Sequence, residues 1–571
     1  MDSHRTIPSD GTLGGAEALV HMLHAHGVKH VFGLCGDTSL PLYDAFARLP
    51  HGIAHVLTRD ERSAAYMADA YARVSGRVGV CEGPSGGGAT YILPGLVEAN
   101  ESSVPVLGIT TDISVSARGR YTLTELDQES LFRPLTKWNT VIDRASKLPE
   151  TVRTAFRQMT TGKPGAAHIG LPLDVQREPV DASDIWAQRE LGLCPAWRSA
   201  PDPAAVTCAA ALLAAAERPL FICGGGVVIA GAEVELAALA QHAGAMVATT
   251  ISGKGSIAEN HPLALGVVGS NGGTPATREL VSRADLVVFV GCRAGSVTTE
   301  KWSVPKRGTR IVHVDIDPGV IGVSYPTEVA LVGDAKLTLA ALNAEFARNH
   351  KARPDKLAAA AIAEAKRGKF DAFRSLAESA ATPIRPERVV AELQRVLPRD
   401  AIIVADPGTP CPYFAAYYQF DDPGRHFISN RAHGALGYSL SAALGAWHGR
   451  PQSKVVAVMG DGSFGFTCGE LETVVRCKAP ITFVVLSNSM YGWIKAGQKT
   501  SYGGRYFGVD FQQTQHARVA EAFGVKAWRV EDPAQLRAAI AAAVQYPGPT
   551  LLDIVCQPLP ESAAPVSEWI V

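Results

Sequence analysis

Short apolar runs alternate with alanine-rich segments along almost the whole chain. Runs such as VKHVFGLCG, RPLFICGGGVV and KVVAVMGDGSF combine an apolar stretch of strand length with glycine. An uninterrupted apolar run of this length is typical of a strand buried on both faces, and the segments between the runs have a helical period. The sequence therefore predicts an α/β fold made of doubly wound parallel sheets, with helices on both faces of each sheet.

The alternation recurs in three blocks, each of which predicts a domain. The blocks cover residues 1–185, 195–347 and 384–571, and an alanine- and lysine-rich segment, 348–383, is expected to form a helical connector. The chain has 571 residues, and at about 150 residues per domain this length predicts three or four domains, which agrees with the division. The first and third blocks look alike in outline, since each has a strand, a glycine-rich turn and an alanine-rich helix.

Charge balance and hydropathy each exclude one class of partner. Lysine and arginine number 54 and aspartate and glutamate 55, so the net charge is −1. A nucleic-acid backbone needs a basic surface, and the chain offers no such excess. No stretch of about 18 uninterrupted apolar residues is present either, so we expect no membrane span.

The cysteines and the first residues indicate a cytoplasmic protein. Ten cysteines are scattered without a CxxC pair, and several, such as Cys223 in LFICGGG, lie in strand-like runs. We interpret them as small apolar residues in a reducing compartment. The opening segment MDSHRTIPSDGTLGG is polar and lacks the apolar core of a signal peptide.

The most informative segment covers residues 455–492. A predicted buried strand ends in Gly460-Asp461-Gly462-Ser463, and the next apolar strand ends at Asn488. Glycines let a backbone approach a phosphate, whose charge a helix N-terminus stabilises. If the strands are parallel neighbours, Asp461 and Asn488 lie together at the edge where α/β sheets bind ligands, and their oxygens suit Mg²⁺. An ordinary strand–turn–helix unit with turn-forming residues is the alternative.

A second candidate site residue is Glu61, in HVLTRDERSAAYMADAYARVSG. The segment predicts a helix that begins near Glu61 and has an apolar face, directly after a strand. Functional side chains are common at such junctions. The alternative is that the carboxylate only complements the helix dipole.

These motifs, in this order, resemble those of the thiamine-diphosphate enzymes related to the acetohydroxyacid (acetolactate) synthase large subunit. The family signature is GDG, some two dozen residues, then a pair of asparagines. Here it reads GDGSF…LSNSMYG, with Ser487 in place of the first asparagine and Asn488 in place of the second. The segment around Glu61 matches the family's RHEQxAxxxAxxYAR segment, and the resemblance extends over essentially the whole chain.

The resemblance implies thiamine diphosphate and Mg²⁺ as cofactors and assigns residues to them. It places the metal on Asp461, Asn488 and the main-chain carbonyl of Met490. It makes Glu61 the catalytic residue, which hydrogen-bonds the aminopyrimidine ring and favours the tautomer whose 4′-nitrogen removes the thiazolium C2 proton. The other implied cofactor contacts are Gly408, Thr409, Gly434, Leu436, Gly460, Gly462, Ser463 and Tyr491. Of these, Leu436 would hold the cofactor bent, which brings the 4′-nitrogen near C2.

The resemblance also implies an architecture and an assembly. The family has pyrimidine-binding, central nucleotide-binding-like and diphosphate-binding domains. The two halves of its active site come from different subunits, so the resemblance implies a homodimer as the minimal active unit and a homotetramer as a common assembly, acting on a small-molecule substrate.

Three approximate alignments depart from a plain acetohydroxyacid synthase. Leu123-Thr124-Glu125 stands where many relatives have Phe-Gln-Glu. Val297, four positions after Arg293, stands where the synthase has an arginine that would clamp a carboxylate, and Gly497 stands where a tryptophan is expected. Cys35, Thr38 and Trp493 are candidate substrate contacts, with ordinary loop or core packing as the alternative.

The sequence therefore predicts a thiamine-diphosphate-dependent carboligase or decarboxylase that acts on 2-oxo acids. A 2-hydroxyacyl-CoA lyase, or another C–C lyase, is the first alternative. An FAD-dependent 2-oxo acid oxidase is a second, since the central turns GGGVV, GCRAG and DIDP could hold FAD or ADP. A non-catalytic scaffold is the third, and the presence of Glu61, Asp461 and Asn488 argues against it.

Overall fold

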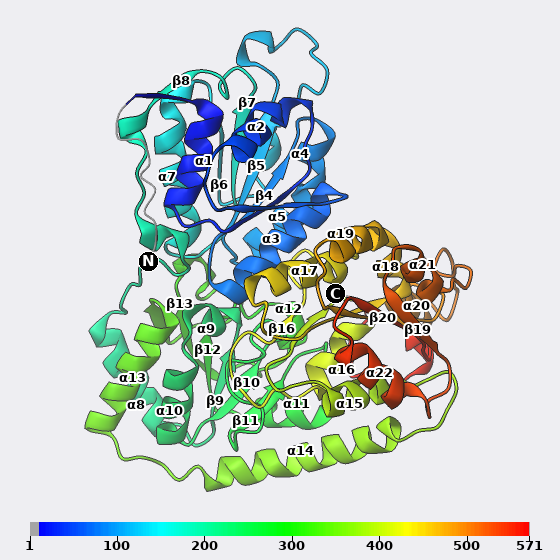
Figure 1. Ribbon diagram of the computed structural model, residues 1–571. Coiled ribbons are helices and arrows are strands. Elements are labelled where there is room, and N and C mark those ends of the chain that lie inside the picture. Colours follow the sequence, from blue (N-terminus) through cyan, green and yellow to red (C-terminus); the bar gives the residue numbers. More distant parts are fainter. Residues whose placement is uncertain (1–10, 570–571) are drawn as a thin grey trace. The chain divides into compact units, whose positions relative to one another are not determined.

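The computed structural model describes residues 11–569 and divides into two compact units (Figure 1). The first unit contains the chain up to Trp197 together with Ala432–Pro451 and Glu472–Arg476. The second contains Arg198–Arg431, Gln452–Leu471 and the chain from Cys477 onward. Most of the opening segment MDSHRTIPSDGTLGG, which the sequence predicts not to be a signal peptide, lies outside the described residues.

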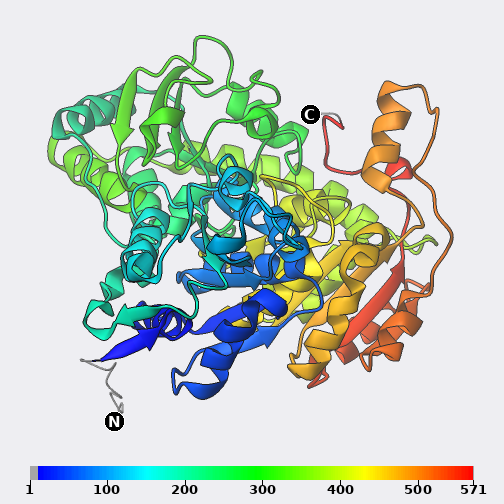
Figure 2. The same cartoon turned by 90° about the horizontal axis from the view of Figure 1, so that it is seen from above.

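The first unit is built on a six-stranded parallel sheet in the order β3-β2-β4-β5-β7-β6. Helices α1 (Gly15–Ala25), α2 (Leu40–Arg48) and α7 (Leu148–Thr160) pack on one face, and α3 (Glu61–Ser75) and α5 (Leu93–Glu101) on the other (Figures 1 and 2). The strands are β2 (His30–Gly33), β3 (Ala54–Leu57), β4 (Gly79–Gly83), β5 (Val106–Asp112), β6 (Trp138–Val141) and β7 (Ala167–Pro172).

Two features of this unit were not predicted. A small antiparallel ribbon joins β1 (Thr12–Gly14) to β8 (Pro179–Asp181). Helix α17 (Tyr438–Gly449), from the third predicted block, packs against α3. The backbones approach so closely that a Cβ at Gly445 would overlap the main-chain oxygen of Met67. Small residues on both helices therefore permit this contact.

The second unit contains two further six-stranded parallel sheets. The central one has the order β11-β10-β9-β12-β13-β14, which is 3-2-1-4-5-6 counted along its own strands. Helices α8 (Pro203–Ala215), α10 (Glu233–Ala243) and α13 (Ala335–Asn349) share one apolar core with it. The strands are β9 (Pro219–Cys223), β10 (Met246–Thr249), β11 (Ala264–Val267), β12 (Leu286–Val290), β13 (Arg310–Asp315) and β14 (Val329–Val332).

The last sheet has the order β16-β15-β17-β18-β20-β19. Counted along its own strands this is 2-1-3-4-6-5, the same order as in the first unit, so the predicted likeness of the first and third blocks extends to topology. Helices α15 (Pro386–Val396), α16 (Pro410–Tyr417) and α22 (Leu536–Gln545) pack into its core. The strands are β15 (Ile402–Ala405), β16 (Phe427–Ile428), β17 (Val455–Gly460), β18 (Thr482–Ser487), β19 (Lys526–Val530) and β20 (Thr550–Val555).

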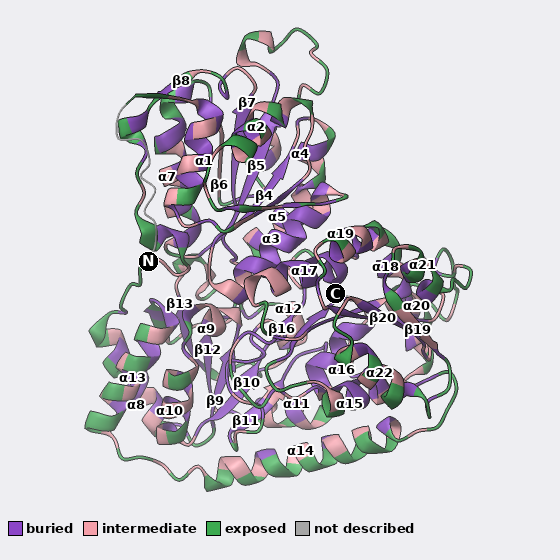
Figure 3. Ribbon diagram, viewed as in Figure 1, coloured by how far each residue is buried: buried purple, intermediate pink, exposed green. Residues whose placement is uncertain are grey.

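The predicted doubly wound α/β fold is thus confirmed in three sheets. The expected helical connector contains α14 (Lys356–Ala377), whose surface is mostly exposed or half-buried (Figure 3). None of the helices within residues 11–569 has the length and apolar character needed to cross a bilayer. No disulfide joins any two of the ten cysteines, all of which lie within the described residues, and five of them are buried.

Candidate active site

Several of the predicted site residues lie, each within its own sheet, at a point where the strand order reverses. In the first sheet the reversal lies between β2 and β4, and in the last sheet between β15 and β17. Ligands of doubly wound sheets bind beyond the carboxyl ends of the strands at such points. Cys35 and Thr38 follow β2, whereas Gly408 and Thr409 follow β15 and Gly460 ends β17.

Asp461 and Asn488 lie side by side, as the parallel strands led us to expect. β17 pairs with β18, and α18 (Asp461–Thr467) begins directly after β17. The Oδ2 atom of Asp461 accepts the main-chain N–H of Asn488 at 2.8 Å and that of Ser489 at 2.6 Å. The buried Oδ1 atom of Asn488 has no hydrogen-bond partner. A buried amide oxygen beside a carboxylate is a donor pair that suits a hard cation.

Glycines leave open space at three of the predicted cofactor positions. A Cβ built at Gly408, Gly434 or Gly460 would have no atom within 4 Å, so the backbone there is accessible to a ligand. Gly462 differs, because a Cβ there would lie 2.7 Å from the ring of Tyr491. That ring also packs edge-on against Phe511, which fixes it beside the first turn of α18.

Glu61 is the first residue of α3. Asp60 precedes it as the N-cap and accepts the main-chain N–H of Arg62 at 2.7 Å, so a different carboxylate caps the helix. Glu61 is buried, and its burial raises the pKa of its carboxyl group above the ordinary value. Its Oε1 atom faces the backbone of Gly88, where a Cβ would approach it to 3.1 Å.

The loop that carries Gly434 and Leu436 is held from within the first unit. Glu98, on α5, accepts the main-chain N–H of His433 at 2.7 Å and that of Ala432 at 3.2 Å. Gly434 follows in the left-handed region, with φ 73°, and Leu436 is half-buried before α17 begins. Glu98 thus fixes the start of a segment that the sequence assigns to the cofactor.

The three candidate substrate residues have different surroundings. The hydroxyl of Thr38 hydrogen-bonds Ser85 and Thr111, and Cys35 is half-buried with its thiol pKa raised by burial. Trp493, in contrast, packs its ring 5.1 Å from that of Trp569 against the apolar core. This packing accounts for Trp493 without a substrate, whereas Cys35 and Thr38 lie at the reversal point.

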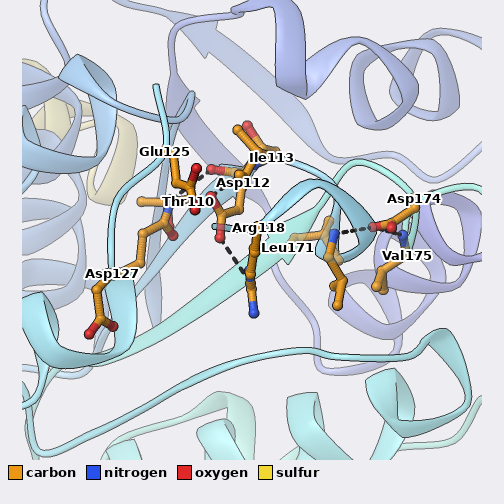
Figure 4. Close-up of polar contacts among 12 residues, drawn as sticks. Thr110, Asp112, Ile113, Arg118, Glu125, Asp127, Leu171, Asp174 and Val175 are labelled. Carbon is orange, nitrogen blue, oxygen red and sulfur yellow. Dashed lines mark hydrogen bonds and ion pairs between the residues drawn. The ribbon is translucent and has the colours of Figure 1, made fainter. Parts of the chain in front are cut away.

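The segment 113–127, which contains Leu123-Thr124-Glu125, is held at its start by two aspartates (Figure 4). Asp112 accepts the N–H of Ile113 and pairs with Arg118 at 3.0 Å, and Asp174 accepts the N–H of Val115 at 3.0 Å. Glu125 accepts two main-chain N–H groups of the same loop. This glutamate therefore shapes the loop, and the exposed Leu123 beside it does not enter the core.

Comparison with known proteins decides the family. Family models match residues 13–131 as the N-terminal binding domain of thiamine pyrophosphate enzymes, 206–342 as their central domain, and 406–554 as their C-terminal binding domain. The chain belongs to the thiamine pyrophosphate enzymes. Its fold and the predicted cofactor class, thiamine diphosphate, are thereby confirmed.

Similar proteins extend over nearly the whole chain. A "Probable acetolactate synthase large subunit" from Methanococcus aeolicus is 35% identical over 96% of this chain and 92% of its own length. A protein of the same description from Methanocaldococcus jannaschii is 35% identical over 95% and 92%, respectively. An "Acetolactate synthase" from Arthrospira platensis is 32% identical over 95% and 93%.

The residues present fit thiamine diphosphate and a divalent cation. The unpartnered oxygen of Asn488 lies next to Asp461, and the backbone at Gly408 and Gly460 is open. Asp461 itself is buried yet accepts three main-chain N–H groups, including that of Gly462. These donors hold the carboxylate in place and leave room for a cation to share it.

Three features of this thiamine pyrophosphate enzyme escaped the sequence analysis. Glu82 is a buried carboxyl group on β4. The sequence feature that could have revealed it is an ionisable residue within the apolar run GRVGVCEG. Arg73 is buried between Asp69 and Glu98, at 2.8 and 3.1 Å. Lys369 is buried on α14. Residue types and the spacing of apolar residues along the chain do not reveal ion pairs or burial that depend on contacts between distant segments.

The glycines of the central turns have a structural explanation. Gly224 and Gly226 follow β9 and Gly291 follows β12, and these strands are neighbours. A Cβ at Gly226 would lie 2.7 Å from the Cα of Gly291, and one at Gly224 would overlap its main-chain oxygen. The two turns thus need glycine to pass each other, independently of any bound nucleotide.

Proposed function

We propose that this thiamine pyrophosphate enzyme is an acetolactate-synthase-like carboligase. It takes a 2-oxo acid such as pyruvate as donor, releases CO₂ and joins the remaining acyl unit to an acceptor. The unpartnered Oδ1 atom of Asn488 beside Asp461 is the observation that carries the cofactor site. The described relatives, named as acetolactate synthases, support the choice of reaction.

In this proposal Mg²⁺ is held by Asp461, Asn488 and the carbonyl of Met490, with Gly408, Thr409, Gly460, Gly462, Ser463 and Tyr491 around the diphosphate. When bound, thiamine diphosphate supplies the carbanion chemistry that breaks a bond next to a carbonyl group. Glu61 holds a hydrogen bond to the pyrimidine ring, for which its raised pKa is suited because the carboxyl exchanges a proton closer to neutral pH. Gly434 and Leu436 hold the pyrimidine in position.

The acceptor pocket distinguishes this chain from a plain synthase. Val297 cannot clamp a carboxylate, and Gly497, buried in α20 (Gly492–Ser501), contributes no aromatic surface. We therefore propose an acceptor that needs no arginine at that position, such as an aldehyde or a ketone, in a homodimer or homotetramer.

The test is a turnover screen of the purified protein with thiamine diphosphate and Mg²⁺. The substrates are pyruvate and longer 2-oxo acids, alone and with added aldehydes, together with acyloins and 2-hydroxyacyl-CoA esters. The proposal requires CO₂ release from a 2-oxo acid that depends on both cofactors and a product larger than the donor. Cleavage of a 2-hydroxyacyl-CoA ester without 2-oxo acid turnover would instead identify a lyase.

A flavin-dependent oxidase is a second candidate, and the strand order of the central sheet favours it. The order 3-2-1-4-5-6 is that of dinucleotide-binding folds, and its reversal point lies between β9 and β12. A yellow purified protein with a flavin absorbance spectrum, and oxygen consumption with pyruvate, would support this candidate. A colourless protein that turns over a 2-oxo acid would exclude the flavin-dependent oxidase and support the carboligase.

A further inference from the structure

The two residues that the sequence assigns to the pyrimidine ring lie in a segment without regular structure. Residues 432–437 form neither helix nor strand, and Gly434 is exposed and Leu436 half-buried. Gly434 and Gly437 both adopt left-handed φ angles, of 73° and 83°. Glycine restricts a backbone only weakly, because it populates both signs of φ. Contacts from outside the segment must therefore set where Gly434 and Leu436 lie.

Glu98 holds the first end of the segment. Its Oε2 atom accepts the main-chain N–H of His433 at 2.7 Å and that of Ala432 at 3.2 Å. Its Oε1 atom accepts the hydroxyl of Ser102 at 2.7 Å and Nη2 of Arg73 at 3.1 Å. The side chain is fully buried, so these donors take the place of water around the carboxylate.

Tyr438, the first residue of α17, holds the other end. Its hydroxyl donates to Oδ2 of Asp69 on α3, and the same oxygen accepts Nε of Arg73 at 2.8 Å. The ring of Tyr438 also packs edge-on against that of Tyr66, with the two centroids 5.2 Å apart. The segment therefore enters α17 from a point that is fixed on α3.

Arg73 joins the two ends. Its side chain is 5% exposed and binds Asp69 through Nε and Glu98 through Nη2. A guanidinium group presents its donors in a rigid fork, so it fixes two carboxylates from different helices relative to each other, which the point charge of a lysine does not. Asp69 and Arg73 belong to α3, which begins at Glu61. One helix thus carries the carboxyl group assigned to catalysis and the groups that hold segment 432–438.

We propose that Arg73, Asp69 and Glu98 are positioning residues for the cofactor. They hold segment 432–438 at both ends, and this keeps the two predicted pyrimidine contacts in place. All three act through the main chain of the segment or through the Tyr438 hydroxyl. The effect on the cofactor rests on the proposed function, whereas the anchoring of the segment does not.

Hydrogen–deuterium exchange of the cofactor-free protein, followed by mass spectrometry, tests the anchoring. Glu98→Met removes the acceptor of the Ala432 and His433 N–H groups and leaves Arg73 paired with Asp69. Exchange in a peptide that contains both N–H groups should become at least about tenfold faster, because hydrogen bonds to a charged group are lost. Exchange at the wild-type rate in this variant would overturn the anchoring.

Ser441→Ala is the matched control. Ser441 on α17 donates to the hydroxyl of Ser63 on α3 at 2.9 Å, so this variant breaks a buried hydrogen bond between the same two helices but outside the segment. Exchange in the same peptide should equal that of the wild type. An acceleration as large as that in Glu98→Met would show that any loosening of the helix pair releases the segment, and would also overturn the proposal.

Calorimetric titration with two ligands tests the effect on the cofactor. With Mg²⁺ present, the ligands are thiamine diphosphate and inorganic diphosphate, which lacks the pyrimidine ring. Glu98→Met and Arg73→Lys should bind thiamine diphosphate about tenfold more weakly than the wild type, and Tyr438→Phe, which loses one hydroxyl, about fivefold. Their affinity for inorganic diphosphate should stay within about twofold, since groups that share no partners behave independently.

The ratio of the two affinities separates positioning from a general loss of structure. Equal losses for both ligands, or no loss for thiamine diphosphate, would overturn the positioning role. Tyr438→Phe removes a single atom, so it decides the matter even where a charge-changing variant does not fold. If the wild type turns over no 2-oxo acid, the proposed function fails, and both measurements still decide the role of Arg73, Asp69 and Glu98.

Discussion

The Oδ2 atom of Asp461 accepts the main-chain N–H of Asn488 at 2.8 Å, and this bond ties together the carboxyl ends of β17 and β18. The two side chains that the sequence assigns to one cation are therefore held side by side by the fold itself. The Oδ1 atom of Asn488 remains buried without a partner. A group of this kind lowers stability unless a ligand satisfies it, which makes the pair a testable cation site.

Asn488→Ala should separate cofactor binding from stability. Because the buried oxygen is unsatisfied without a cation, its removal should leave the free energy of unfolding of the cofactor-free protein within about 0.5 kcal/mol of the wild type or raise it. The affinity for Mg²⁺ and thiamine diphosphate, measured by calorimetric titration, should fall at least about tenfold.

Ser487→Ala is the matched control for this experiment. Ser487 donates to Asp553 at 2.5 Å and stands where the family has another asparagine. Its loss should lower stability by about 1 kcal/mol and leave cofactor affinity unchanged. Equal cofactor affinity in Asn488→Ala and the wild type would contradict the cation site.

Arg73→Met should destabilise the first unit strongly. Arg73 is almost fully buried and pairs with Asp69 and Glu98, so its removal leaves two buried carboxylates without their cation. Such a change costs about 3–5 kcal/mol. Urea unfolding measures this loss of free energy.

Arg48→Met is the control. It breaks two exposed ion pairs, with Glu17 and Asp44, and should cost less than about 1 kcal/mol. Similar losses in the two variants would show that burial is not what makes the Arg73 pairs important.

Lys369→Met should stabilise the protein, and the gain should shrink as pH rises. The ammonium of Lys369 lies near the rings of Phe370 and Tyr417, and burial, with repulsion from Lys254, lowers its pKa to about 7. Between this value and the ordinary 10.5 the unfolded chain binds more protons than the folded one, so wild-type stability rises with pH in that window.

The gain from Lys369→Met should be about 1–4 kcal/mol at pH 7, as for other buried charges replaced by apolar side chains. Urea midpoints at pH 7 and pH 9.5 measure it. Lys356→Met, at the exposed start of the same helix, should change neither value. A gain that does not depend on pH would mean that Lys369 is charged in the folded protein throughout this range.

The sequence was sufficient for the fold class and for the pairing of Asp461 with Asn488, because both follow from the order of buried parallel strands. It also located Glu61 at a junction of strand and helix. It could not reveal that Glu98 holds the main chain of Ala432 and His433, since the two segments are more than 300 positions apart. Nor could it show that Gly33 makes room for Glu82, because the space left by a glycine on one strand can be assigned to a side chain only when the neighbouring strand is known.

The sequence leaves two interpretations of Trp493 open, a substrate contact and ordinary aromatic packing in the core. Its ring packs against Trp569 and the apolar core, which favours the second interpretation, and the substrate contact stays a prediction. Trp569 contacts Trp493 of α20 although the two residues are far apart in the sequence, and local sequence does not encode such a contact. Cys35 and Thr38 stay predicted substrate contacts, and only the three-dimensional structure supplies their surroundings.

The rate of hydrogen–deuterium exchange at C2 of bound thiamine diphosphate, followed by proton NMR after rapid acid quench, tests the central claim most directly. With Mg²⁺ present, Glu61→Gln should bind the cofactor as the wild type does but exchange this proton about 10²–10⁴-fold more slowly, the usual contribution of a positioned acid–base group. An exchange rate in Glu61→Gln equal to that of the wild type would contradict the role assigned to Glu61.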